Sequence, residues 1–291
     1  MNIGVFTQYI RAQSIEELAD RVAGHGLRSV VLDTYPGLDI DLTAPSAAHC
    51  RRIRAAFEHA GVSIAAVGAY QNLVHPDPQE RQKVYDRMNG MVRLCEGIGS
   101  PMVCTETGSF HPNGGDWEPS NLTDRAIDLL AQYVAPLLDV CRRSGVTLSL
   151  EPYVMTVTWS ADRLATFIDR VGRERVQAVY DPAGILTRVT LDDQEPFLRE
   201  SFRAIEPHLG LVHVQDVTPA TKYENHFNWQ SAGTGVIDYP LFLELVAGSG
   251  YEGPLILEFL CEEQIPTALK FVREQWTRAI RRSSSPSEQD R

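Results

Sequence analysis

The chain has 291 residues, of which 43% are hydrophobic, so it can bury a large core in one or two domains. Its formal net charge of −11 argues against a nucleic-acid backbone as the main partner, because phosphate binding requires clustered Lys and Arg side chains. The basic residues are scattered, and the densest cluster, Arg51, Arg52 and Arg54, is typical of a solvated helix face.

The sequence carries no sign of a membrane or of an oxidising compartment. The first residues, MNIGVFTQYI, lack the basic and apolar segments of a signal peptide. No apolar run reaches the roughly 18–20 residues that a membrane span requires. The 5 cysteines include no CxxC pair, and their odd number favours reduced thiols. We therefore expect a cytoplasmic protein without a membrane partner.

Strands and helices alternate along the chain. Short apolar, β-branched runs predict eight strands. Because the residues that would point to either face of these strands are apolar, the runs suit a parallel sheet that is covered on both faces. The predicted strands are residues 3–7, 29–33, 63–69, 102–106, 147–151, 176–181, 211–215 and 255–259.

Stretches with helical periodicity lie between these strands. Ser14 and Glu17 form a capping box at the start of the first one, and Gly61 and Gly145 end two of the later ones. Asp238 caps another helix, with Pro240 in its first turn. The predicted helices are residues 14–22, 45–60, 79–97, 123–144, 160–171, 196–205, 238–248 and 265–280.

Eight strand–helix units without a break in composition predict an α/β fold, a single (β/α)₈ TIM barrel over residues 1–281. Glycine before a strand recurs in AGVSIAAV, SGVTLSLE and SGYEGPLILE, as repeated αβ loops require. A doubly wound open sheet is the alternative, but no GxGxxG motif follows the first strand. The polar residues 282–291 are predicted to form a disordered tail.

Long loops follow the third, fourth and seventh strands, and a barrel keeps its site in the loops at the carboxyl ends of its strands. These loops are rich in His, Asn, Gly and Trp, although exposed loop histidines often have no function. Tyr70, Tyr153 and Trp229 are candidates for an apolar wall against a sugar face. The candidate substrate-binding residues are Glu106, His75, His111, Lys222, His226 and Trp117.

Four metal-ligand side chains stand at the carboxyl ends of four predicted strands. Glu151, Asp181, His213 and Glu258 occur in SLEP, VYDP, LVHVQD and LILEF. Each one alone has an ordinary explanation, such as a helix cap, a turn or a hydrogen-bonded core histidine. In a parallel barrel, however, these strand ends converge, and three carboxylates with a neutral imidazole suit a hard divalent cation. We predict one ion, Mn²⁺ first, with Mg²⁺, Co²⁺ or Zn²⁺ as alternatives.

Glu151 and Glu258 would approach a substrate from two directions. One carboxylate could remove a proton from a carbon next to a carbonyl while the other returns a proton. A cation between them would polarise the carbonyl oxygen and stabilise an enediolate. This chemistry predicts isomerisation or epimerisation of a small carbohydrate or polyol.

The sequence resembles the xylose isomerase-like barrels of the sugar phosphate isomerase/epimerase group. The matching motifs are SLEP, VYDPAG, HVQD, GTGVIDYP and LILEF, and the match runs from IGVFT to LILEF. In ketose 3-epimerases of this group, the matching Glu, Asp, His and Glu bind the metal, and the two glutamates are the acid/base pair. The resemblance implies these roles for Glu151, Asp181, His213 and Glu258, and it implies a homodimer or homotetramer.

Some residues depart from the family's pattern. Gly184 stands where His or Asn is frequent, Gln215 stands where many members have Lys, and PYVMTVTWS lacks the second Glu of ketose epimerases. The ligand set therefore matches better than the substrate-facing residues do. No glycine-rich phosphate loop or arginine cluster is evident, which favours an uncharged sugar or polyol.

Other functions of such a barrel give different expectations. An inosose dehydratase-type lyase would share the proton abstraction and then expel hydroxide from a cyclic polyol ketone. A DNA-repair endonuclease would need additional His and Glu ligands and basic loops, which the sequence lacks. A non-catalytic sugar-binding barrel would bind its ligand without metal, and it has no need of charged groups at four strand ends.

Overall fold

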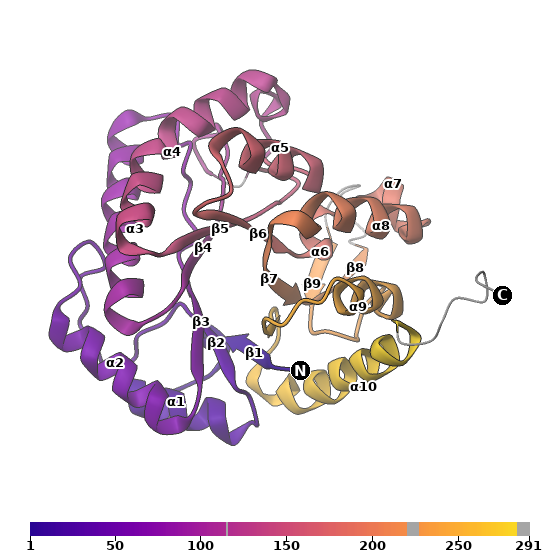
Figure 1. Cartoon of the computed structure of the whole chain (residues 1–291), viewed down its shortest axis with the longest axis horizontal. Coiled ribbons are helices and arrows are strands. Elements are labelled where there is room, and N and C mark those ends of the chain that lie inside the picture. The colour runs from indigo at the N-terminus through magenta and orange to yellow at the C-terminus, as the bar shows by residue number, and fades with distance from the viewer. Residues whose placement is uncertain (115, 220–226, 284–291) are drawn as a thin grey trace.

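Eight parallel strands close into a barrel in the order β1-β10-β7-β6-β5-β4-β3-β2. The computed structural model describes residues 1–114, 116–219 and 227–283. The closed barrel confirms the predicted (β/α)₈ fold, with the strands at the centre and the helices around them (Figure 1). The barrel strands are β1 (Ile3–Phe6), β2 (Ser29–Leu32), β3 (Ser63–Gly68), β4 (Met102–Glu106), β5 (Thr147–Glu151), β6 (Val176–Tyr180), β7 (Leu209–Val214) and β10 (Leu255–Leu257).

Helices link the strands, and their ends carry the signals seen in the sequence. The Ser14 hydroxyl accepts a hydrogen bond from the Glu17 amide at 3.2 Å. Gly61 and Gly145 follow helix ends with φ angles of 67° and 72°, which glycine adopts at little cost. The long helices are α1 (Ile15–Gly24), α2 (Ala47–Ala60), α3 (Pro78–Ile98), α4 (Asp124–Ser144), α5 (Ala161–Val171), α8 (Gln194–Ile205), α9 (Tyr239–Gly248) and α10 (Ile265–Ser283).

Side chains from the strands fill the barrel interior. One inward residue from each of seven strands joins a buried apolar cluster, and Ser149 of β5 is equally buried. Because side chains alternate between the two faces of a strand, the residue two positions further along each strand also points inward. The interior cluster consists of Phe6, Val31, Ala66, Cys104, Val179, Leu211 and Ile256.

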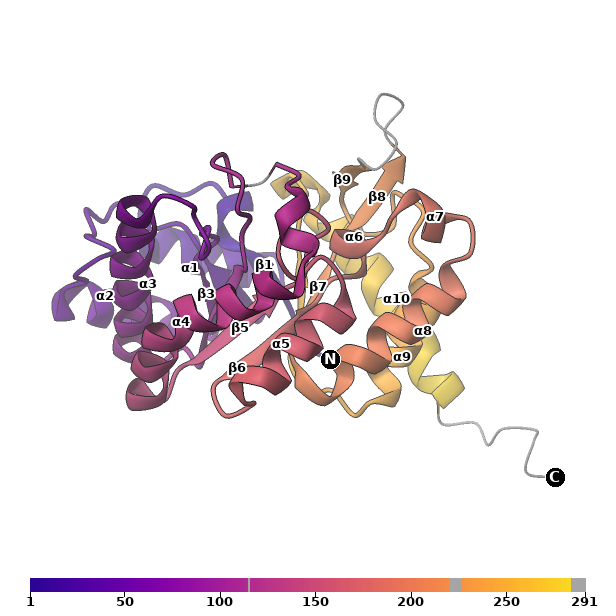
Figure 2. The ribbon, with the colours of Figure 1, turned by 90° about the horizontal axis from the view of Figure 1, so that it is seen from above.

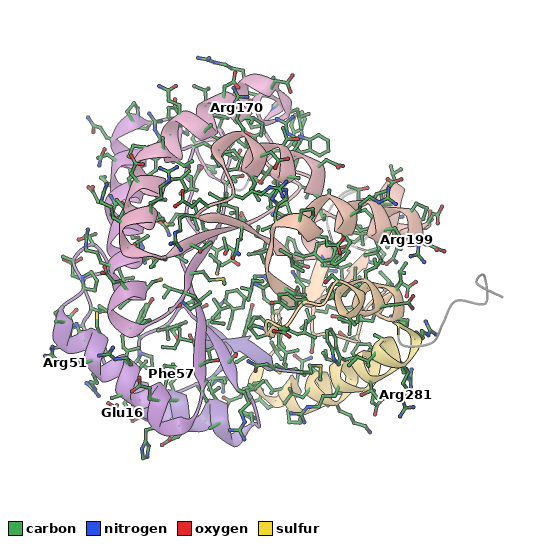
Figure 3. All side chains as sticks on the ribbon, in the orientation of Figure 1. Glu16, Arg51, Phe57, Arg170, Arg199 and Arg281 are labelled. Atoms are coloured by element: carbon green, nitrogen blue, oxygen red, sulfur yellow. The ribbon has the colours of Figure 1, made fainter. Side chains whose placement is uncertain are left out.

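The outer faces of the helices are polar. Arg51, Arg52 and Arg54 are exposed on α2, as predicted, and Figure 3 shows Arg51 on the outside of the molecule. Arg52 also joins α2 to α1 through an ion pair with Glu16, with Nε 2.6 Å from Oε1. Phe57 on the opposite face is 1% exposed and belongs to the core. No helix within the described residues is both long and apolar enough to cross a membrane.

Three segments differ from the sequence-based prediction. Two short helices, α6 (Pro182–Ile185) and α7 (Arg188–Leu191), precede α8, because Asp181 and Thr187 each cap a new turn. The loop after β7 contains an antiparallel hairpin of β8 (Asp216–Pro219) and β9 (Phe227–Gln230). Figure 2 shows this hairpin rising from one end of the barrel. Helix α10 extends to Ser283, two residues into the predicted tail, and residues 284–291 lie outside the described part.

Glu262, which precedes the last helix, contacts residues near the start of the chain. Its carboxylate accepts hydrogen bonds from Arg21 (2.7 Å), His25 (2.9 Å) and the Arg11 amide (3.1 Å). Burial opposes its ionisation, but His25, Arg21 and the Arg11 amide together lower the pKa of Glu262 to about 2. This carboxylate therefore stabilises the fold most above the ordinary Glu pKa, and the stabilisation is lost as the pH falls toward 2.

We expect Glu262→Gln to lower the free energy of unfolding by about 1–3 kcal/mol at neutral pH, because charge-assisted hydrogen bonds are lost. The difference between variant and wild type should shrink as the pH falls from about 4.5 toward 2. Urea unfolding across this pH range measures both effects. Glu274→Gln, at an exposed position of α10, is the control. If Glu262→Gln lowered the free energy of unfolding by the same amount at every pH, the role assigned to the Glu262 carboxylate would be contradicted.

Candidate functional site

The strand ends bring the predicted ligands together. Glu151, Asp181, His213 and Glu258 each lie two positions beyond an inward residue of the barrel interior, so they form the next inward layer. One ligand atom from each residue lies within 4.8 Å of all the others. All four side chains are buried, and Glu258, at 8%, is the most exposed. Residues up to 107 positions apart in sequence thus share one point.

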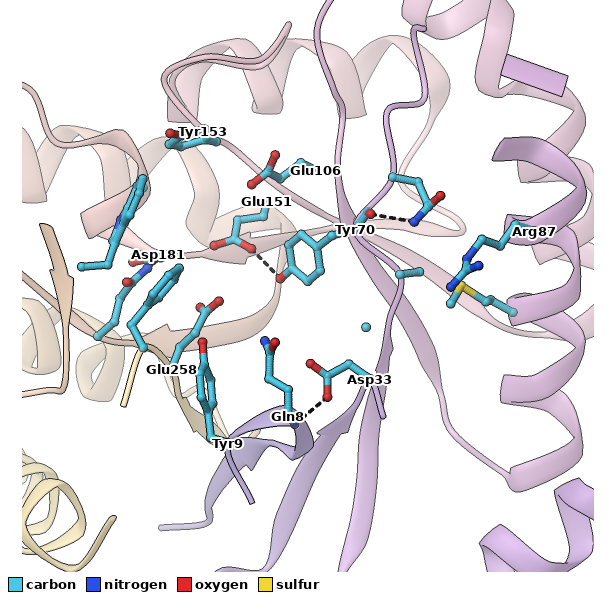
Figure 4. A pocket seen from close by; sticks show the side chains of 18 residues that line it. Gln8, Tyr9, Asp33, Tyr70, Arg87, Glu106, Glu151, Tyr153, Asp181 and Glu258 are labelled. Carbon is cyan, nitrogen blue, oxygen red and sulfur yellow. Dashed lines mark hydrogen bonds between the residues drawn. The ribbon is translucent and has the colours of Figure 1, made fainter. Parts of the chain in front are cut away.

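Direct contacts fix the orientation of these side chains. His213 Nδ1 lies 3.3 Å from Glu151 Oε1 and 3.2 Å from Glu258 Oε2. Tyr70 donates its hydroxyl hydrogen to Glu151 Oε2 at 2.7 Å (Figure 4). Asp181 accepts hydrogen bonds from the Ala183 amide, at 2.9 Å, and from the side chain of Gln215. Nδ1 of His213 therefore faces the carboxylates of Glu151 and Glu258.

The cluster holds an excess of negative charge. Burial, reinforced by repulsion from Glu151 and Glu258, raises the pKa of Asp181 well above its usual range. Burial also raises the pKa of Glu258. Burial acts on Glu151 in the same sense, but His213 and the Tyr70 hydroxyl outweigh it and lower the pKa of Glu151. Burial would lower the pKa of His213, yet Glu151 raises it well above its usual value.

This donor set fits a divalent cation. Three carboxylates and one imidazole nitrogen converge, and no Lys or Arg within the described residues forms an ion pair with any of them. Oxygen-rich sets of this kind suit Mg²⁺ and Mn²⁺. A buried cluster of carboxylates without a compensating cation is costly, so it must take up either protons or a metal ion. The cluster could therefore bind a metal ion.

A cavity of about 530 Å³ opens above the cluster. Its wall includes an aromatic group in which Trp229 of β9 stacks on Phe259, with ring centroids 5.3 Å apart, and Tyr153 tilts against Trp229 at 5.8 Å. Phe259 has a φ of 50°, a strained value for a residue with a side chain, and it directly follows Glu258. The polar and charged lining residues are Gln8, Tyr9, Asp33, Tyr70, Gln71, Arg87, Glu106, Glu151, Asp181, Gln215 and Glu258.

Two further carboxyls face this cavity. Burial raises the pKa of Glu106 to about 8, with a smaller contribution from the charges of Glu151 and Glu258. Burial also raises the pKa of Asp33 to about 6, although Thr7 donates a hydrogen bond to it at 2.7 Å. Glu106 therefore carries a proton over most of the neutral range and can donate a hydrogen bond there.

The sequence matches the profile of the xylose isomerase-like TIM barrel family over residues 19–280. This chain belongs to that family. The match confirms the resemblance to these barrels that was expected from the sequence. No curated protein gives a significant sequence match.

Several solved structures share this xylose isomerase-like fold. A 3-keto-D-glucoside 4-epimerase from E. coli is 16% identical, with 94% of this chain and 99% of that chain covered and a TM-score of 0.70. An L-ribulose 3-epimerase is 16% identical over 99% and 100% of the two chains, with a TM-score of 0.73. A xylose isomerase-like TIM barrel protein from Mycobacterium smegmatis, in complex with magnesium, is 18% identical over 92% and 89%, with a TM-score of 0.68.

The remaining predicted site residues fall into three groups within this xylose isomerase-like barrel. Glu106, Tyr70, Tyr153 and Trp229 line the cavity. Three others are absent from its lining: His75 accepts a hydrogen bond from the Asp77 amide, His111 pairs with Asp116, and Trp117 is 56% exposed. The predicted residues outside the described part of the chain are Lys222 and His226.

Some cavity residues were not predicted from the sequence. Gln8 follows β1 by two residues, so strand alternation applied to the first strand would have found it. Tyr9 lies in the same short turn as Gln8. Arg87 belongs to α3, and no local pattern separates it from the other arginines of that helix.

We expect Tyr70→Phe to slow the chemistry of this xylose isomerase-like site by about tenfold, because Glu151 loses a hydrogen bond worth roughly 1.5 kcal/mol. Without that donor the pKa of Glu151 should rise, so the acid limb of a pH–rate profile should move to higher pH. Tyr133→Phe, whose ring lies outside the cavity, is the control. An unchanged acid limb would show that the hydroxyl does not act through Glu151.

Proposed function

We propose that this chain is a sugar isomerase or epimerase that depends on a divalent metal ion. The observation that carries the proposal is the convergence of Glu151, Asp181, His213 and Glu258. Glu151 ends β5 and Glu258 directly follows β10. The fold-level likeness to a 3-keto-D-glucoside 4-epimerase and an L-ribulose 3-epimerase supports it. The substrate would be a small carbohydrate or polyol that carries a carbonyl group.

The two glutamates are placed for proton transfer. Glu151 is kept ionised by His213 and Tyr70, so it suits the removal of a proton from the carbon beside the carbonyl. Burial raises the pKa of Glu258, so it suits the return of a proton to the same or the neighbouring carbon. Asp181 and His213 would complete the ligand set beside the two glutamates.

When bound, a divalent cation would polarise the substrate carbonyl and stabilise the negative charge of the enediolate oxygens. Glu151, Asp181, His213 and Glu258 would hold it. We propose Mn²⁺ first and Mg²⁺, Co²⁺ or Zn²⁺ as alternatives, because a set of three carboxylates and one imidazole favours hard cations. The similar Mycobacterium smegmatis barrel in complex with magnesium supports a metal of this class.

Glu106 gives a specific reason to keep a second candidate, a lyase that acts on a cyclic polyol ketone. Its carboxyl lines the cavity and holds a proton up to a pH of about 8. A third carboxyl of this kind could protonate a hydroxyl group that leaves as water after the same proton abstraction. An epimerase has no need of this acid, and there Glu106 would donate a hydrogen bond to a sugar oxygen.

One experiment tests both candidates. The Mn²⁺-loaded protein is incubated in D₂O with a panel of ketoses, keto-glycosides and inososes, and the products are examined by mass spectrometry and NMR. Deuterium at a carbon next to the carbonyl, with the mass otherwise unchanged, supports the epimerase or isomerase. Loss of water from the product identifies the lyase. If no member of the panel takes up deuterium or loses water, both candidates are contradicted.

A further inference from the structure

Arg87 lies at one end of the cavity that opens above the four predicted metal ligands. It lies on α3 and is the one Lys or Arg among the residues that line the cavity within the described part of the chain. Figure 4 shows Arg87 entering from α3, with Asp181 and Glu258 at the other end of the view. Because helix side chains lean toward the helix N-terminus, Arg87 leans toward the end of α3 at which Pro78 follows the third strand's loop.

The guanidinium group of Arg87 has no partner in the described part of the protein. No hydrogen bond or ion pair reaches it, and its buried Nε lacks an acceptor. Asp33 lines the same cavity, yet its carboxylate is held by Thr7 and the Gln8 amide. Arg87 is thus a donor at this end of the cavity without an acceptor.

A half-buried cation without a counter-charge is unfavourable unless a ligand supplies one. The planar guanidinium fork matches the two oxygens of a carboxylate or a phosphate. A cavity of about 530 Å³ also has room for a substrate that extends from the four buried ligands toward Arg87.

We infer that Arg87 forms a subsite for an anionic group on the substrate, a carboxylate or a phosphate, at a distance from the reacting carbon. This inference rests on the proposed function and replaces the uncharged sugar that the sequence favoured. The substrate class is then a keto sugar acid or a keto sugar phosphate. Arg87 acts in binding and specificity, while the proton transfers remain with Glu151 and Glu258.

The test compares three probes with one carbon skeleton: D-fructose, D-fructuronate and D-fructose 6-phosphate. Calorimetry with the Mn²⁺-loaded protein gives the affinity of each. We expect one anionic probe to bind the wild type at least about tenfold more tightly than D-fructose, and Arg87→Gln to remove that preference. The carboxylate and the phosphate probe tell the two anions apart. Arg87→Lys should keep part of the preference, because the charge remains and the fork is lost.

Lys83→Gln is the matched control, since it removes one positive charge from an exposed position of the same helix. The inference is wrong if the wild type binds all three probes equally, or if Lys83→Gln loses as much anion affinity as Arg87→Gln. Deuterium uptake by the same probes separates this result from the proposed function. Uptake from D-fructose without anion preference would overturn only the subsite, and anion preference without uptake from any probe would overturn only the proposed chemistry.

Discussion

Glu258→Gln should abolish deuterium exchange into the substrate, with a loss of at least about 10²–10⁴-fold. The amide cannot carry a proton between substrate and solvent, and it replaces one of three anionic ligands in a cluster whose ligand atoms lie within 4.8 Å of one another. Glu258 is also 3.2 Å from His213 Nδ1, so the change weakens the contact that orients the imidazole. Exchange followed by NMR in D₂O measures the effect.

Glu263→Gln is the matched control for this variant, because the same substitution is made at an exposed position nearby. Glu151→Gln should cause a loss of similar size, since the two glutamates act as a pair. If Glu258→Gln keeps more than about a tenth of the wild-type exchange rate while still binding the metal, Glu258 is a ligand and not an acid or base.

His213→Ala should remove most of the stabilisation that Mn²⁺ gives to the folded protein. An ion present at about 100 times its Kd stabilises the fold by about 2.7 kcal/mol, which corresponds to a rise of roughly 4–5 °C in Tm for a chain of this size. The variant loses the buried nitrogen donor and leaves three carboxylates that repel one another. Thermal unfolding with and without Mn²⁺ measures the difference.

The stabilisation of the folded protein by Mn²⁺ should weaken at low pH. Protons compete with the metal for the ligands, and the pKa values of Asp181 and His213 are raised in the metal-free cluster. The rise in Tm caused by Mn²⁺ should therefore shrink as the pH falls. His59→Ala, at an exposed position, is the control. An equal rise in Tm for His213→Ala and the wild type would place the metal elsewhere.

The barrel and the centre of the site follow from local rules. Most of the strands are apolar on both faces, and a polar residue such as Asp181 or His213 stands two positions beyond an apolar residue of the barrel interior. Since parallel strands of a closed barrel end on one rim, the sequence positions of these residues were enough to predict that they meet. Strand boundaries and glycine caps such as Gly61 depend on similarly short-range chemistry.

The outer part of the cavity depends on packing that a single sequence does not reveal. His111 lies in a long loop like Trp229, but the pairing of β8 with β9 brings Trp229 over the cavity, whereas His111 pairs with Asp116. Phe259 adopts a positive φ angle, and a sequence indicates such a backbone conformation only where it has a glycine. Arg87 reaches the cavity from a helix whose other arginines face outward or contact loops, so its role depends on tertiary structure.

The most direct test of a catalytic metal centre measures exchange and metal content in the same samples. The wild type is stripped with a chelator and titrated with Mn²⁺, and bound metal is determined beside the rate of deuterium entry into the best substrate. Exchange should rise in proportion to bound metal and level off near one ion per chain. Exchange at full rate in protein that holds almost no metal would contradict the role assigned to Glu151, Asp181, His213 and Glu258.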